Sequence, residues 1–178
     1  MPGRKDPGHT TGAAGARIDP KRSLRTGWHR IAGVPLDIRI LDTDAEIRTA
    51  FPLMATLRDR IDAETFLAEV RRQQRDGYQL VGGFDHGDLV ALAGVRPAHT
   101  LSRGEHVFVD DLVTDERRRG QGHGTAMLRW VAVRARSRGV PRVYLDSRST
   151  ATGFYERVGF TRLTSVPCWI DVDTLASA

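Results

Sequence analysis

Hydrophobic and polar residues alternate in the segment PLDIRIL at positions 35–41, and this period of two predicts a β-strand. The polar residues Asp42, Thr43 and Asp44 follow directly. Their short side chains are of the types that cap helix N-termini, so we expect a helix to begin there. Proline lacks a backbone N–H, and Pro52 is therefore expected to end or kink that helix.

The spacing of apolar residues changes several times along the rest of the chain. The further elements are expected to be, in chain order, a helix over about 62–76, strands at 78–84, 88–97 and 106–114, a long helix at 125–139, a strand at 142–147, a short helix at 150–159 and one or two strands within 160–172. Gly77 and Gly159 are expected to end two of the helices. Because hairpins precede a single crossover helix, the predicted fold class is α/β (α+β), with a mixed, mainly antiparallel central sheet flanked by about four helices.

Length and charge indicate one folded domain with a tail. The 178 residues are enough for a single domain with its own hydrophobic core. Residues 1–30 contain seven Lys or Arg and two acidic residues, so they carry the whole formal charge of +5 and the remainder is neutral. We expect residues 1–33 to form a basic, disordered tail ahead of a single domain at 34–178. A basic tail is able to bind nucleic acid, but a solubilising extension is the simpler interpretation.

Composition also limits the cellular setting and the cofactors. The sequence contains no apolar run of about 18 residues and no apolar N-terminal region, which argues against a membrane span and a signal peptide. Cys168 is the only cysteine, so neither an intramolecular disulfide nor a multi-cysteine metal site is expected. These features predict a cytoplasmic protein without a bound metal.

The stretch RRRGQGHGTAMLRW, at positions 117–130, carries the clearest chemical signal. Gly120, Gly122 and Gly124 alternate with other residues between a buried strand and an amphipathic helix. Glycines let the backbone approach a ligand, and a helix N-terminus presents unpaired N–H groups and the positive end of the helix dipole. Phosphate is the expected guest, because successive N–H groups form an anion-binding hollow.

Two other phosphate-binding motifs match this turn less well. A dinucleotide-binding fingerprint needs G-x-G-x-x-G directly after a strand, with an acid about 20 residues later. Asp146 lies near that distance, but Thr125 occupies the third glycine position, and five residues separate the strand from Gly120. A Walker A loop is excluded because no Gly-Lys-Ser/Thr follows. A dinucleotide-binding enzyme therefore ranks as the alternative.

The spacing R-x-x-G-x-G, formed by Arg119, Gly122 and Gly124, is the better match. The longer string DLVTDERRRGQGHGTAMLRW resembles the acetyl-CoA-binding motif of the GNAT family of N-acetyltransferases, and TATGFYERVGF resembles a downstream motif of the same family. The two motifs stand one helix and one strand apart, as they do in that family. The resemblance covers about residues 36–173. It implies the acyl-CoA N-acyltransferase fold and an enzyme that moves the acetyl group of acetyl-CoA directly to a primary amine.

The resemblance also indicates which residues contact acetyl-CoA. The pyrophosphate is expected on the backbone amides of the glycine turn, and the pantetheine arm is expected beside the strand that precedes it. The residues so assigned are Leu112, Val113, Thr114, Arg119, Gly120, Gln121, Gly122, His123, Gly124 and Thr125. A backbone N–H of that strand would also hold the developing oxyanion, which typically contributes about 3 kcal/mol. His123 fills a variable family position and is expected to line the turn, not to act as a base.

Catalytic roles follow from the same resemblance. Tyr155 matches a tyrosine that faces the coenzyme sulfur, where a phenol can protonate the leaving thiolate. The acceptor amine must lose a proton before it attacks, and Asp110 and Asp111 stand where the family often carries acids. Adjacent strand residues point to opposite faces, so a regular strand would present only one of the two carboxylates, and a bulge would change that. Glu105 and His106 are weaker candidates.

The sequence leaves the acceptor open as a small amine, an amino acid, a polyamine or a protein amine. The pair of aspartates favours a cationic acceptor. An asparagine that many family members carry before the second motif is absent, so Ser147, Arg148 or Ser149 would have to replace it. The neutral domain disfavours a nucleic-acid partner, although binding through the basic tail is an alternative function. A homodimer agrees with the resemblance.

Overall fold

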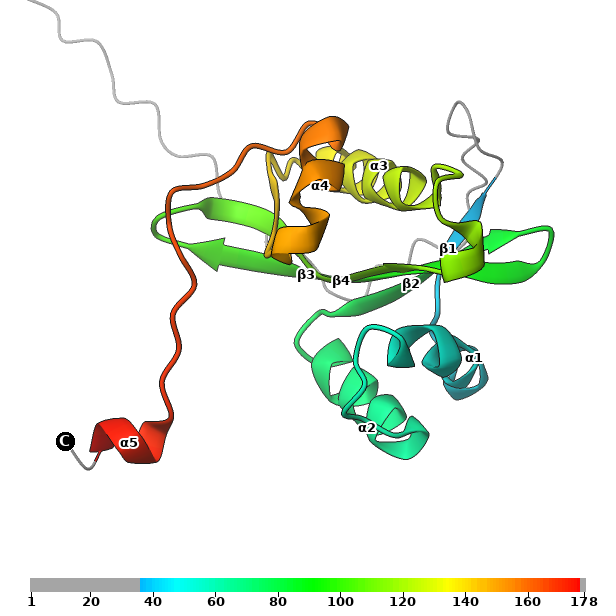
Figure 1. Cartoon of the computed structure of the whole chain (residues 1–178), viewed down its shortest axis with the longest axis horizontal. Coiled ribbons are helices and arrows are strands. Elements are labelled where there is room, and N and C mark those ends of the chain that lie inside the picture. The colour runs from blue at the N-terminus through cyan, green and yellow to red at the C-terminus, as the bar shows by residue number, and fades with distance from the viewer. Residues whose placement is uncertain (1–35, 177–178) are drawn as a thin grey trace, which may run out of the picture.

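The structure is a computed structural model that describes residues 36–176 (Figure 1). The strands are β1 Asp37–Ile40, β2 Gln79–Asp85, β3 Asp88–Thr100, β4 Gly104–Thr114 and β5 Val143–Leu145. The helices are α1 Asp44–Ala55, α2 Ala63–Gln74, α3 His123–Ser137, α4 Thr152–Val158 and α5 Val172–Ala176, with 3-10 helices η1 Glu116–Arg118 and η2 Ser149–Ala151. The predictions for the tail and for the start of the domain at residue 34 lie outside the described residues.

The five strands form one sheet in the order β1-β2-β3-β4-β5. Neighbouring strands are antiparallel except for β4 and β5, which pair in parallel and are connected through α3. Helices α1 and α2 cover one face of the sheet, and α3 and α4 cover the other (Figure 1). This mixed, mainly antiparallel sheet with four helices on its faces confirms the predicted fold class.

The sheet divides the hydrophobic core into two layers. Leu41, Ile47 and Leu80 are fully buried between the sheet and helices α1 and α2. Val81 of β2 and Met127 of α3 are fully buried in the layer between the sheet and α3. Leu80 and Val81 are neighbours on β2 and enter opposite layers, as expected for a strand covered on both faces.

Local sequence signals set several helix ends. Thr43 caps α1: its hydroxyl accepts from the Glu46 N–H at 3.2 Å, and the Glu46 carboxylate accepts from the Thr43 N–H at 3.0 Å. This reciprocal pair is a capping box. The Asp62 carboxylate caps α2 by accepting from the Thr65 N–H at 2.8 Å. Gly159 adopts a φ of 109° and ends α4, as predicted.

Pro52 does not end α1, which was one of the two outcomes predicted for it. The helix continues to Ala55, where the buried Met54 packs the last turn onto the sheet. One strand prediction was wrong. Residues 160–171 form no strand, although their composition is β-prone. A strand forms only where another strand supplies hydrogen-bonding partners, and Pro167 has no N–H to offer.

Candidate functional site

The parallel strands β4 and β5 separate in the middle of the domain. They pair at Val107 with Val143, at Phe108 with Tyr144 and at Val109 with Leu145, and the pairing ends there. β4 nevertheless continues to Thr114, paired on its other side with β3. The edge of β4 from Asp110 to Thr114 therefore has no strand beside it among residues 36–176. Leu112, Val113 and Thr114, predicted to lie beside an extended ligand, are all on this open edge.

A β-bulge occurs where this opening begins. Gly94 of β3 faces Asp111, and Val95 faces Val109, so Asp110 is the extra residue of the bulge. The sequence left open whether the two aspartates could act at one place. The bulge frees Asp110 from the ladder, so the two carboxylates take partners from different elements.

The Asp111 carboxylate is fixed by two partners across the α1–α2 face. Arg58 donates from Nε to one oxygen at 2.7 Å, and the Tyr78 hydroxyl donates to the other at 3.1 Å. Arg58 also donates to the backbone carbonyl of Asp110 at 2.9 Å, so it holds the bulge as well. Burial and the neighbouring Asp111 charge raise the pKa of Tyr78 well above its ordinary value, which keeps the phenol protonated as a donor.

Gly94 is required by this cluster. A Cβ atom at position 94 would lie 2.1 Å from the Tyr78 hydroxyl and 2.6 Å from a carboxylate oxygen of Asp111. Any larger side chain would therefore displace the hydrogen bond between Tyr78 and Asp111. Because glycine has no side chain, position 94 leaves room for the hydrogen bond between Tyr78 and Asp111.

Asp110 is held differently. Its carboxylate accepts from Nε of Arg96 at 2.9 and 3.1 Å, and the Arg96 guanidinium lies over the Phe108 ring at 5.0 Å. Desolvation by burial raises the pKa of Asp110, and the hydrogen bond and charge of Arg96 oppose that shift without cancelling it. A carboxylate with a raised pKa beside an opening is the usual state of a general base.

The glycine turn forms the start of α3. Gly120 and Gly122 have φ values of 80° and 87°, in the left-handed region that glycine tolerates. α3 begins at His123, two residues before the predicted start, and its N-cap Gly122 makes no side-chain capping hydrogen bond. The first N–H groups of a helix have no acceptor within the helix, so this end suits an anion such as pyrophosphate.

The three arginines before the turn do not act as a unit. Arg118 pairs with Asp85 at 3.2 Å and with Asp88 at 3.7 Å, so it is directed to the β2–β3 hairpin. Arg119 pairs with Glu116 at 3.4 Å and is exposed beside the turn. Arg119, which was predicted to contact the coenzyme, thus lies beside the turn, whereas Arg118 is directed away from it.

Gly124 brings three elements together. A Cβ atom there would lie 3.1 Å from the Phe154 ring of α4 and 3.6 Å from the Thr114 hydroxyl at the end of β4. The predicted phosphate turn, the open edge of β4 and the second motif on α4 therefore meet at one place. Gly124 permits this contact because it adds no atoms between the helix and its neighbours.

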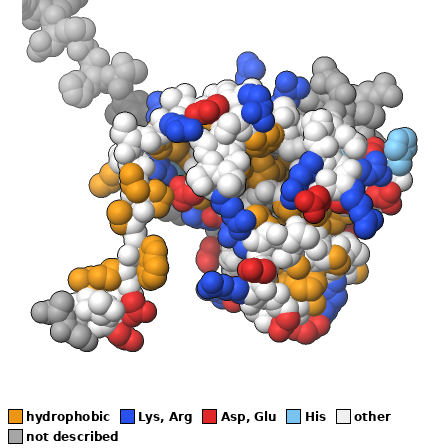
Figure 2. Space-filling view, in the orientation of Figure 1, with side chains coloured by type: hydrophobic (Ala, Val, Ile, Leu, Met, Phe, Trp, Pro, Cys, Tyr) orange, Lys and Arg blue, Asp and Glu red, His pale blue; other side chains and the backbone are white. Residues whose placement is uncertain are grey.

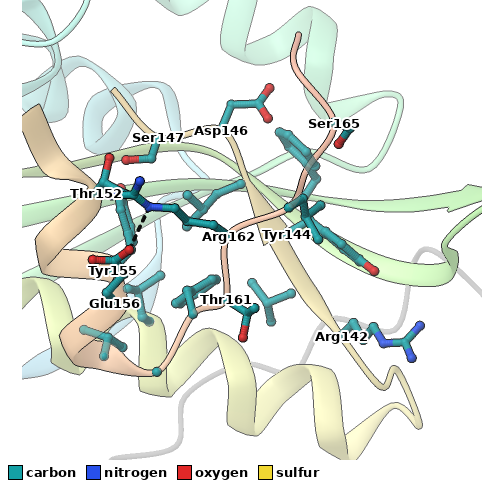
Figure 3. Close-up of a pocket in the computed structure, with 18 of the residues that line it drawn as sticks. Arg142, Tyr144, Asp146, Ser147, Thr152, Tyr155, Glu156, Thr161, Arg162 and Ser165 are labelled. Atoms are coloured by element: carbon teal, nitrogen blue, oxygen red, sulfur yellow. Dashed lines mark ion pairs between the residues drawn. The ribbon is translucent and has the colours of Figure 1, made fainter. Parts of the chain in front are cut away.

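Tyr155 lies on α4 next to this junction. Its ring packs edge to face against Phe154 and Phe160, with centroids 5.0 and 5.7 Å apart. Burial raises the pKa of its phenol, so the hydroxyl stays protonated at neutral pH. Tyr155 also lines a cavity of about 960 Å³ between α3, α4, β5 and residues 161–167, shown in Figure 3.

Arg148 joins the two sides of the site. Its guanidinium donates to the backbone carbonyl of Leu57 at 3.1 Å, so the loop before α4 touches the loop between α1 and α2. Sequence reasoning named Arg148 as a replacement for the absent asparagine, and it assigned Arg58 no contact. Neither partner could be identified, because Leu57 and Asp111 are distant along the chain from the arginines that bind them.

The remaining candidate residues differ in burial. His123 is buried, and neither ring nitrogen has a hydrogen-bond partner among the described residues. Gln121 is exposed in the turn, and Thr125 is half-buried in the first turn of α3. His106 is also buried, hydrogen-bonded at 2.9 Å to the Gly104 carbonyl, while Glu105 is exposed. His106 is thus engaged in packing the start of β4.

Within residues 36–176, no cluster of three His, Cys, Asp or Glu side chains is placed to hold a metal ion. No helix in the same part of the chain has the length and apolar character needed to cross a bilayer.

Known proteins with similar sequences match most of the chain. Residues 45–160 match the model of the acetyltransferase (GNAT) family. An uncharacterised N-acetyltransferase of Bacillus subtilis strain 168, YhdJ, is 31% identical over 131 residues, which are 71% of this chain and 92% of that protein. A glucosamine 6-phosphate N-acetyltransferase of Trypanosoma brucei brucei is 27% identical over 133 residues, covering 71% of this chain and 90% of that protein.

Solved structures agree in fold. An acetyltransferase of Trypanosoma brucei matches with a TM-score of 0.64 and 24% identity over 77% of this chain and 99% of its own. The aminoglycoside N-acetyltransferase AAC(6')-Iy, solved in complex with CoA, matches with a TM-score of 0.68 and 16% identity over 77% of this chain and 95% of its own. With the two motifs meeting at the end of β4, and with the family model matched from α1 to α4, this chain belongs to the GNAT family of acetyltransferases.

Proposed function

We propose that this chain transfers the acetyl group of acetyl-CoA directly to the primary amine of an acceptor. One observation carries the proposal: β4 loses its parallel partner at Asp110, so an open strand edge runs from a carboxylate to a helix N-terminus. An extended ligand with an anionic end fits such a path. Membership of the family and the CoA complex of a structural neighbour support the same coenzyme.

The residues of this path fit coenzyme A. The amides of Gly120 to Thr125 would hold the pyrophosphate, because the turn has two left-handed glycines and no side chain capping the helix. The backbone of Leu112 to Thr114 would pair with the pantetheine arm as a neighbouring strand would. The bound coenzyme would supply the acetyl thioester, and a backbone N–H of β4 would donate to its carbonyl oxygen.

Asp110 would prepare the acceptor. An alkylamine has a pKa of about 10.4 and is mostly protonated at neutral pH. The Asp110 carboxylate would bind the ammonium group and take its proton, directly or through water, and its raised pKa favours that transfer. The freed nitrogen lone pair then forms a bond to the acetyl carbon as the carbon–sulfur bond breaks.

Tyr155 would complete the transfer by protonating the departing sulfur, and the second proton that the nitrogen loses as it becomes an amide would return through water to the Tyr155 phenolate. Its phenol is a neutral donor because burial raises its pKa. Asp111 would act as a positioning residue, since both its oxygens are occupied by Arg58 and Tyr78. The acceptor would lie between the α1–α2 loop and the bulge of β4. Candidate acceptors should be screened for acetylation. They are glucosamine 6-phosphate and aminoglycosides, which the names of two similar proteins suggest, together with polyamines, amino acids and peptide amines.

Calorimetric titration of the full chain with acetyl-CoA, and with NAD as the competing ligand class, tests the proposal. Gly122→Glu places a bulky anion in the turn and should abolish acetyl-CoA binding. Gly139→Glu is the matched control, because Gly139 also has a positive φ, of 73°, but follows the other end of α3 and faces open space. Binding of NAD in place of acetyl-CoA, or equal binding by both variants, would reject the assigned coenzyme site.

A further inference from the structure

Two neighbouring aromatic rings lie on one face of the sheet close to the bulge of β4. Phe108 of β4 pairs with Tyr144 of β5, so both side chains point to the same face. The residues that alternate with them pack into the core layer between the sheet and α3, and they are Val107, Val109, Val143 and Leu145. Phe108 and Tyr144 therefore point to the face on which α1 and α2 lie, where both are half-buried.

An arginine is stacked on each of the two rings. The guanidinium carbon of Arg96 lies 5.0 Å from the centroid of the Phe108 ring, and that of Arg103 lies 4.7 Å from the centroid of the Tyr144 ring. Because the N–H bonds of a guanidinium lie in its plane, stacking holds the group in place and leaves its edges able to donate. These four residues form one small surface, the stacked-arginine patch.

The donors of this patch are only partly used. Arg96 donates to Asp110 through Nε alone, so its two terminal nitrogens make no hydrogen bond to residues 36–176. In the same part of the chain, the Arg103 guanidinium contacts the Tyr144 ring and no carboxylate. The fork of N–H groups on an arginine matches carboxylate and phosphate oxygens. The patch therefore suits an anionic group.

The cavity beside the patch has the same sign of charge. Three of the four patch residues line the cavity of about 960 Å³ that Tyr155 also lines. The lining contains four arginines and two acidic residues, and one of those acids, Glu156, is paired with Arg162. In Figure 3, Tyr144 and Arg142 lie at the end of the cavity away from Tyr155. Basic side chains also gather along the seam between the two helical layers in Figure 2.

The two aspartates of the bulge do not offset this positive charge. Asp111 pairs with Arg58 and Asp110 pairs with Arg96, so neither carboxylate is unbalanced. An acceptor that carries only cationic groups would place further positive charge against Arg103. An acceptor with an anionic group as well as its amine would neutralise Arg103 instead, and charge complementarity of this kind discriminates between ligands.

We propose that the acceptor is a zwitterionic amine, whose ammonium group binds at Asp110 and whose phosphate or carboxylate group binds the free N–H groups of Arg96 and Arg103. Two residues along β4 span about 6.6 Å and neighbouring strands are about 4.8 Å apart, so Asp110 and Tyr144 are separated by roughly 8 Å. The anionic group is therefore expected several bonds from the amine. The position of the amine rests on the proposed function, whereas the anion site rests on the stacked arginines and the charge of the cavity.

Calorimetric titration of the full chain with glucosamine 6-phosphate and with glucosamine tests the anion site, because the two probes differ only in the phosphate. The wild type should bind the phosphorylated probe about 10–100-fold more tightly, as charged hydrogen bonds from arginine would provide. Arg103→Gln should remove most of this difference, and Arg103→Glu should reverse it. Arg136→Gln is the matched control, since Arg136 is exposed on α3 and does not line the cavity.

Lysine and lysinamide form a second pair of probes, which differ in the carboxylate charge and separate a carboxylate site from a phosphate site. Absence of binding, equal binding within both pairs, or a preference that survives both Arg103 substitutions would overturn the proposal.

Turnover distinguishes failure of this inference from failure of the proposed function. Within the preferred pair, the ratio of kcat/KM for the anionic probe to that for its uncharged counterpart is measured by thiol release from acetyl-CoA. This ratio should fall about 10–100-fold in Arg103→Gln and stay at the wild-type value in Arg136→Gln. Anion-dependent binding without thiol release would support the anion site and reject the proposed transfer. Equal turnover within both pairs would support the transfer and reject the anion site.

Discussion

The assignment of different roles to the adjacent Asp110 and Asp111 makes the sharpest prediction. Asparagine at each position is nearly isosteric and removes only the charge. For Asp110→Asn we expect kcat/KM to fall by about 10²–10⁴, the usual contribution of a general base. That loss corresponds to about 3–5 kcal/mol of barrier. Asp111→Asn should lower kcat/KM much less, because Asp111 holds the bulge and does not take the proton.

The two variants should rank the other way in stability: Asp111→Asn should be destabilised, and Asp110→Asn should not. Asp111 accepts from Arg58 and Tyr78 and its side chain is only 12% exposed. Losing its charge weakens each hydrogen bond by about 1 kcal/mol, so unfolding should cost about 2 kcal/mol less and Tm should fall by about 4–8 °C. Asp110 has a raised pKa, so its ionised form costs the folded state stability at pH above that pKa. Asp110→Asn should therefore unfold at the wild-type temperature or slightly above it.

The assay is thiol release from acetyl-CoA with the acceptor found in the screen. It is followed from pH 9 down to the lowest pH at which the protein stays folded, and it is paired with thermal unfolding at pH 7. The wild-type rate should fall as the pH drops through the raised pKa of Asp110, and this limb should be missing in Asp110→Asn. An Asp110→Asn enzyme within tenfold of wild type would refute the assignment of the base. Equal losses of stability in the two variants would show that Asp110 is also structural.

Three further predictions test other parts of the structure. Tyr155→Phe keeps the ring that packs on Phe154 and Phe160, so kcat should fall by about 10²-fold while Tm and acetyl-CoA affinity, measured by unfolding and calorimetry, stay at wild-type values. Glu46→Gln should lower the unfolding free energy by about 1 kcal/mol at pH 7. Hydrogen bonding to the Thr43 N–H lowers the pKa of Glu46 from 4.5 to about 2, so the loss should be complete above pH 4.5 and shrink as pH falls toward 2. Gly94→Ala should cost about 1–3 kcal/mol in denaturant unfolding. Its cost should be smaller in a Tyr78→Phe background, where the closest clashing atom is gone, and strictly additive losses would contradict the contact.

The candidate site residues that sequence reasoning named are local. The glycine turn, the strand before it and Tyr155 lie in two short motifs of the chain. Thr43 and Asp62 likewise reveal helix starts, because a cap bonds to residues within the next turn. These features depend on spacing along the chain, which the sequence displays directly.

The parts that it missed depend on strand register and on distant partners. Arg58 and Tyr78 reach Asp111 from 53 and 33 positions away, at the place where β4 bulges at Asp110. A bulge is a mismatch between two strands, so neither strand shows it alone. The failed strand prediction for residues 160–172 has a related cause. Side-chain composition indicates that a segment can form a strand, but pairing also requires that the segment lie along a strand edge, which composition does not determine.

The opening between β4 and β5 lies where two parts of the chain that form in different ways meet. β2, β3 and β4 are joined by tight hairpins and pair over most of their lengths, whereas β5 reaches β4 only after η1 and α3 and pairs with it from Val143 to Leu145. Pairing across a long intervening segment carries a larger loop-closure entropy than pairing across a hairpin. The site thus lies at the seam between a meander that closes locally and a crossover unit that docks onto it. Fluctuations that part these two units would widen the space beside Leu112 to Thr114 and would leave every antiparallel ladder intact.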